Sequence, residues 1–169
     1  MNLIGPEEFD LEFTKCKFEK LVPRAKEGMS ARARARRPKL YVVTDGQVPV
    51  YVGITRQPIV ARLRYGWYAD GRTGYYGYAW RRCLKTASLW LWFHPRRGKS
   101  AVRELETIEA EVVYEIRRKG QWPEHQTQIH FHPSSPEHRD AALAVLGSFD
   151  SGVAARRALL ANNASHPEA

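Results

Sequence analysis

The stretch from Leu40 to Ile54, LYVVTDGQVPVYVGI, decides how this chain folds. Its two ends, Leu40 to Thr44 and Val48 to Ile54, are rich in β-branched residues, which favour strands. The Asp45-Gly46 pair between them is typical of a hairpin turn. We therefore expect two antiparallel strands at the centre of the fold.

The register of this hairpin decides which side chains share a sheet face. A three-residue loop of Asp45, Gly46 and Gln47 places Thr44 opposite Val48 and, by counting back, Tyr41 opposite Tyr51. Two tyrosines then lie opposite each other on one face. The other face carries the apolar residues Leu40, Val42, Val50 and Val52.

Three more elements are predicted after the hairpin. A short helix covers Gln57 to about Gly66, with Pro58 at its first position. Ser88 to His94, SLWLWFH, alternates as a buried strand does. Ser100 is a candidate N-cap for a helix that runs to about Lys119, before Gly120 and Pro123.

A carboxylate interrupts the apolar face of this last helix. At 100° per residue, Glu109 falls in the middle of the stripe formed by Val102, Leu105, Ile108, Val112, Val113 and Ile116. A buried carboxylate costs several kcal/mol unless it is paired or bound to a metal. Glu109 is therefore either one half of a buried ion pair with an arginine or a functional group that binds metal or transfers protons.

The two ends of the chain give weaker patterns. Residues 1–37 show no sustained period and end in SARARARRPK, so we expect a basic N-terminal arm. A cap at Ser134 to Glu137 predicts a helix through Leu146, followed by a weaker helix from Val153 to Ala161. The predicted class is α+β: a small three-stranded antiparallel sheet flanked by helices over 38–130, with a helical C-terminal extension over 131–169.

Charge is distributed unevenly along the 169 residues, whose formal net charge is +9. Residues 21–39 hold seven Lys or Arg against one acidic residue (+6), and residues 56–104 hold eleven against two (+9). The segments 1–20 and 105–169 are net acidic. Two basic blocks suit a polyanionic partner, although a charged run is also found on ordinary solvated surfaces.

The second basic block also carries aromatic residues and glycines, a mixture that favours nucleic-acid contacts. We expect a nucleic acid as the partner. The arginines predicted to contact it are Arg34, Arg36, Arg64, Arg72, Arg81, Arg82, Arg96 and Arg97.

Several classes of protein and site are disfavoured. The longest apolar run, Leu89 to Phe93, is too short to cross a membrane, and the acidic start does not resemble a secretory signal, so we expect a cytoplasmic protein with no membrane partner. Cys16 and Cys83 indicate reduced thiols rather than a disulfide scaffold. His125, His130 and His132 lack a fourth ligand for a transition-metal site. Phosphate-binding Walker loops, dinucleotide fingerprints and nucleophile elbows are absent from the sequence.

Four motifs in order resemble the GIY-YIG nuclease family. They are Leu40-Tyr41-Val42, Tyr51-Val52-Gly53, Arg62-Leu63, and Ile108 to Val113 before Trp122-Pro123. The resemblance covers about residues 38–130. Three positions differ from the family pattern. Lys39-Leu40 replaces a glycine and an isoleucine, Gln126 replaces an asparagine, and Gly66 stands where many members have His or Tyr.

The resemblance implies a metal-dependent DNA endonuclease that hydrolyses phosphodiester bonds with one Mg²⁺ or Mn²⁺ ion. Glu109 would be the metal ligand, Arg62 would bind the scissile phosphate, and Tyr41 would act as base or position water with support from Tyr51. Gln126 would orient the loop or hold a phosphate oxygen. Non-catalytic binding of nucleic acid on the same scaffold is the alternative, a basic protein-binding domain is a third, and a homodimer is possible.

Overall fold

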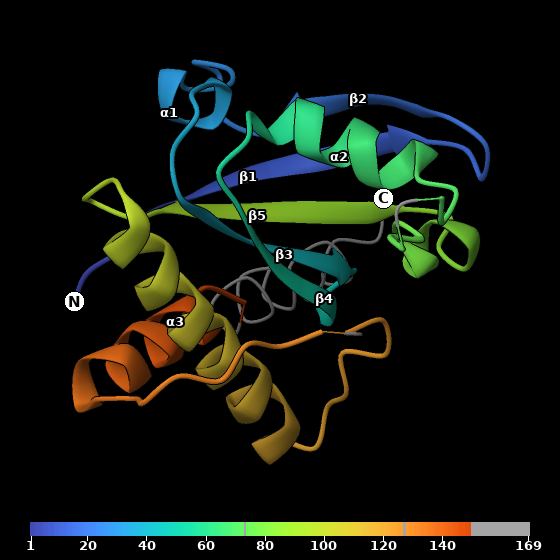
Figure 1. Ribbon diagram of the computed structural model, residues 1–169. Helices are drawn as coiled ribbons and strands as arrows, with labels where there is room; N and C mark the ends of the chain where they lie inside the picture. The colour runs from blue at the N-terminus through green and yellow to red at the C-terminus, as the bar shows by residue number, and fades with distance from the viewer. Residues whose placement is uncertain (73, 127, 150–169) are drawn as a thin grey trace, which may run out of the picture.

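The computed structural model describes residues 1–72, 74–126 and 128–149 (Figure 1). At its centre is the expected hairpin, formed by β3 (Lys39–Asp45) and β4 (Val48–Thr55). Its turn has two residues rather than three, since Asp45 pairs with Val48, and the register shifts after Val43. Tyr41 therefore pairs with Gly53, and the predicted pairing with Tyr51 is wrong.

The register shift leaves Val50 without a partner on β3, and the strand alternation reverses there. Tyr41 and Tyr51 still share a face, with ring centroids 5.8 Å apart, because they lie diagonally across the pair. Val50 joins them on that face instead of packing with Val52 on the other. The bulge thus keeps the tyrosines together while changing their neighbours.

The sheet has five antiparallel strands in the order β2-β1-β5-β3-β4, so the prediction of three strands is wrong. The expected strand after the hairpin is β5 (Ala87–Phe93). The two additional strands, β1 (Ile4–Phe13) and β2 (Phe18–Pro23), come from the segment expected to form an arm. Phe9 and Leu11 of β1 are buried, while Asp10 between them is exposed, as in a strand with one solvated face.

One face of the sheet is covered by α2 (Ile59–Tyr68), with the short α1 (Ala31–Arg34) beside it (Figure 1). Ile59, Leu63 and Trp67 of α2 pack on the face that holds Tyr41. The connection from α2 to β5 contains a short 3-10 helix, η1 (Ala79–Arg82). Arg62 of α2 therefore lies on the same face as Tyr41 and Tyr51.

The opposite face is covered by α3 (Lys99–Arg118) and by helical residues 136–149 (Figure 1). Leu40, Val42, Trp90 and Trp92 pack against both helices. The N-cap of α3 is Gly98 rather than Ser100, whose hydroxyl instead donates to Glu104. The predicted α+β class and the helix that carries Glu109 are confirmed, while the helix expected over Val153 to Ala161 lies outside the described residues.

Within the described ranges, every helix is too short or too polar to span a bilayer.

Candidate active site at the edge of the sheet

A cleft of about 620 Å³ opens beside β4, the edge strand of the sheet. Tyr51 of β4, Arg62 of α2 and Glu109 of α3 all line it. The loop between α2 and β5 forms its outer wall, mainly with Tyr75 and Tyr78. Because α2 and α3 lie on opposite faces of the sheet, their polar side chains can meet only at this edge.

Hydroxyl groups hold the guanidinium of Arg62 from the protein side. Its Nε donates to Tyr41 Oη over 3.3 Å, and Tyr41 Oη shares a hydrogen bond of 3.2 Å with Tyr78 Oη. Tyr78 Oη also donates to the carbonyl of Arg62 over 3.5 Å. Arg62 is thereby anchored through Nε, and its two terminal amino groups form no ion pair with any described carboxylate.

Aromatic rings complete the environment of Arg62. Its guanidinium carbon lies 5.1 Å from the ring centroid of Tyr75, 5.6 Å from that of Tyr78 and 6.0 Å from that of Tyr65. The rings of Tyr65 and Tyr75 stack 5.3 Å apart. Cations lie favourably over such rings, and three of them restrict the rotamers of a long side chain. The result is a cation held in one place before any ligand arrives.

Gly53 explains how two tyrosine rings fit over the end of the hairpin. A Cβ at this position would lie 2.7 Å from the ring of Tyr51 and 2.8 Å from that of Tyr41. Such contacts are too short for carbon atoms, so only glycine allows both rings to lie flat over the strand. The Tyr51-Val52-Gly53 motif thus has a packing reason in this chain.

Both tyrosines of the hairpin are neutral phenols. Burial raises the pKa of Tyr41 well above its ordinary value of 10, and the neighbouring Tyr78 adds to this while Arg62 opposes it. Burial likewise raises the pKa of Tyr51, with a further contribution from Tyr41. Tyr41 is fully buried, whereas Tyr51 lines the cleft, so Tyr51 is the hydroxyl placed to meet a ligand.

Glu109 is buried, with 5% of its surface exposed, as its position in the apolar stripe predicts. Gln126 Nε2 donates to its Oε1 over 3.5 Å, and none of the described arginines forms an ion pair with it. Burial raises its pKa to about 8, with Gln126 and Arg62 opposing this shift and Glu106 adding to it. Within the described residues, the buried ion pair offered as an alternative from the sequence is therefore absent.

Gln126 fastens the segment after α3 to the edge strand. Its Oε1 accepts from Val52 N over 3.0 Å, and its Nε2 donates to the carbonyl of Gln128 over 2.9 Å. His125 N donates to the carbonyl of Val50 over 3.1 Å. These contacts place Gln126 between β4 and Glu109, so it orients both the segment and the carboxyl.

Two residues of the site were not predicted from the sequence, Tyr78 and Glu106. Tyr78 fills the space beside Gly66, where a Cβ would lie 2.3 Å from its ring. A glycine inside a helix costs about 1 kcal/mol relative to alanine, and this cost was a signal that another group approaches closely there. Glu106, one helical turn before Glu109, lines the same cleft, and its carboxylate contacts His132 Nε2 at 2.7 Å.

The arginines predicted to contact DNA are dispersed around the molecule. Arg82 lines the cleft, and Arg64 lines a neighbouring hollow with Tyr65 and Tyr68. Arg81 donates to the carbonyl of Gly66 over 3.2 Å, which supports the loop. The remaining five lie outside the lining of both hollows. Two of them form ion pairs, Arg72 with Asp70 and Arg96 with Glu104, whereas Arg34, Arg36 and Arg97 form none with the residues that the structure describes.

The described part of the chain contains no group of three or more His, Cys, Asp or Glu side chains arranged to hold a metal. His130 lines the cleft, and His132 contacts Glu106. Glu109 and Glu106 are the carboxylates that the cleft offers from α3. This donor set suits a hard cation that keeps most of its water ligands.

A scan against protein-family models and searches of curated proteins and of solved structures each return no significant match.

Proposed function

We propose that this protein is a divalent-metal-dependent DNA endonuclease of the GIY-YIG type. One observation carries the proposal: Arg62 and Glu109, from helices on opposite faces of the sheet, line the same cleft as Tyr51 of β4. A preset cation and a buried carboxylate beside a neutral hydroxyl are the groups that phosphodiester hydrolysis requires. The order of the four sequence motifs supports the same reading.

The residues present fit a bound Mg²⁺ or Mn²⁺ ion. Glu109 is buried, lacks an ion-pair partner among the described residues and lies close to a second carboxylate, Glu106. A divalent ion would stabilise the ionised form of Glu109, which burial otherwise disfavours. When bound, such an ion would polarise the phosphate and favour ionisation of a coordinated water.

The other groups bind and orient the substrate. The terminal amino groups of Arg62 bind two phosphate oxygens as a fork and offset the charge that develops on them. Tyr51 donates its hydroxyl hydrogen to the attacking water or to a phosphate oxygen. Tyr41 holds Arg62 Nε, so it is a positioning residue in this proposal rather than the base suggested by the resemblance.

The test is the nicking of supercoiled plasmid DNA by purified protein with Mg²⁺ or Mn²⁺. Glu109→Gln and Arg62→Lys should each abolish nicking, since one removes the metal ligand and the other the bidentate fork. Glu124→Gln, at an exposed position beyond α3, is the matched control and should nick like the wild type. Equal nicking by wild type and Glu109→Gln, or none by the wild type with either metal, would refute the proposal.

A second candidate is a nucleic-acid-binding module without catalysis on the same scaffold. The observation that favours it is that burial keeps Tyr41, Tyr51 and Glu109 protonated near neutral pH in the absence of metal. This candidate predicts salt-sensitive binding of DNA that Glu109→Gln leaves unchanged, with no nicking under any metal. The same set of variants therefore separates the two.

A further inference from the structure

Two smaller hollows continue from the cleft along α3. One, of about 410 Å³, shares Ile54 and Arg62 with the cleft; the other, of about 290 Å³, shares Glu106 with it. The two hollows in turn share Arg56 and Val102. They form one groove, here called the Arg56 groove, between the segment after β4 and the first two turns of α3.

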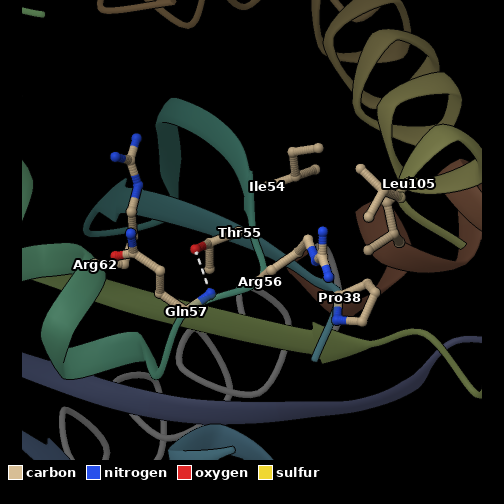
Figure 2. Close-up of a pocket in the computed structure, with 8 residues that line it drawn as sticks. Pro38, Ile54, Thr55, Arg56, Gln57, Arg62 and Leu105 are labelled. Atoms are coloured by element: carbon tan, nitrogen blue, oxygen red, sulfur yellow. Dashed lines mark hydrogen bonds between the residues drawn. The ribbon is translucent and has the colours of Figure 1, made fainter. Parts of the chain in front are cut away.

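Besides Arg62, three cations border this groove: Arg56, Lys99 and Arg103. Figure 2 shows Arg56 extending toward the α3 side, while Arg62 projects from α2. Lys99 and Arg103 line the second hollow and lie four residues apart, hence on one side of α3. All three are exposed, and within the described ranges none has an ion-pair partner.

The two nearby carboxylates, Glu104 and Glu106, have other partners and form no ion pair with Arg56, Lys99 or Arg103. Glu104 accepts from Arg96 over 2.6 Å and from Ser100 over 3.0 Å, and its other oxygen contacts His94 Nε2 at 3.0 Å. Glu106 is held by His132. The first two turns of α3 hold no acidic residue besides Glu104 and Glu106. The groove therefore has a surplus of positive charge.

From this arrangement we infer that the Arg56 groove carries the phosphodiester backbone of the nucleic acid away from the cleft, with Arg56, Lys99 and Arg103 each contacting a phosphate. The inference rests on the proposed function only in taking Arg62 to hold a phosphate at the cleft end. Lys99 and Arg103 are separated by about 6 Å along the helix axis, so they present charge along a line rather than at a point. A linear polyanion that already crosses Arg62 fits such a track.

The test compares binding of a fluorescein-labelled DNA duplex in EDTA, where cleavage does not interfere. One variant combines Arg56→Ala, Lys99→Ala and Arg103→Ala. Its charge-matched control combines Lys15→Ala, Lys17→Ala and Lys20→Ala, which are exposed positions on and before β2, at the opposite sheet edge from β4. Circular dichroism melting confirms that both variants fold.

The groove variant should bind about 10- to 100-fold more weakly at moderate salt. The slope of its log binding constant against log salt concentration should decrease in magnitude by about three, one for each lost phosphate contact. The control should bind within about twofold of the wild type. Equal binding by the groove variant and the wild type would overturn the inference even if the wild type nicks plasmid. If the groove variant binds more weakly and the wild type does not nick plasmid with either metal, the groove would be supported and the nuclease proposal overturned. Displacement of the labelled duplex by poly-glutamate at a lower concentration of charged groups than unlabelled DNA requires would overturn the inference in favour of an acidic peptide partner.

Discussion

Replacement of Glu109 by glutamine measures how strongly the fold disfavours a charge at the cleft. Burial raises the pKa of this carboxyl from its ordinary value of 4.5 to about 8. Below pH 4.5 the group is protonated in both folded and unfolded chains. As the pH rises toward 8, the unfolded chain loses the proton while the folded chain keeps it, so the free energy of unfolding falls.

A shift of this size corresponds to about 5 kcal/mol, at about 1.4 kcal/mol per pKa unit. Glutamine cannot ionise, so the free energy of unfolding of Glu109→Gln does not fall in this way. The variant should therefore become more stable than the wild type as the pH rises. The assay is urea unfolding followed by circular dichroism in EDTA, from about pH 5 to about pH 9. The difference between the two proteins should grow through that range and level off above about pH 8.

Mg²⁺ provides the second arm of this experiment. It should restore wild-type stability at high pH, since it binds the ionised carboxyl, and it should leave Glu109→Gln unchanged. Glu124→Gln serves as the control and should follow the wild type with and without metal. Parallel stability curves for wild type and Glu109→Gln across the whole pH range would show that burial does not hold this proton, and the reasoning would be refuted.

Three further substitutions probe the supports of the site. Gly66→Ala places a methyl group 2.3 Å from the ring of Tyr78, so it should lower the free energy of unfolding by about 1–3 kcal/mol and reduce nicking, as measured by thermal melting and the plasmid assay. Lys39→Met removes three hydrogen bonds from the buried Nζ to backbone carbonyls, and urea titration should show a loss of about 2–4 kcal/mol; an unchanged midpoint would contradict this. Gln126→Ala removes the hydrogen bond that lowers the pKa of Glu109, so Mg²⁺-dependent nicking should need a higher pH than in the wild type, and an unshifted pH profile would argue against this contact.

The parts of the fold with local patterns were predictable. The β3–β4 hairpin, β5 and α3 were each indicated by a period that one segment carries by itself, and Glu109 stood out because it broke such a period. β1 carries a weaker alternation, in which Phe9, Leu11 and Phe13 are separated by Asp10 and Glu12, and its strongest pairing is with the distant β5. A strand of this kind is stabilised by its neighbours more than by its own sequence.

The candidate site was predictable only in part, for a similar reason. Tyr41, Tyr51, Arg62, Glu109 and Gln126 do gather at one edge of the sheet. Which tyrosine faces the cleft depends on a one-residue bulge and on the path of the loop after α2, and neither has a local signature.

The two-sided packing of the sheet also has a spectroscopic consequence. Trp67 and Trp80 belong to the core beneath α2, Trp90 and Trp92 belong to the core beneath α3, and Trp122 is largely exposed. Indole emission depends on local polarity, so variants that keep one pair would report on one face alone. Quenching by a ligand at Arg62 and loosening of α3 would then appear as separate signals, each from its own variant.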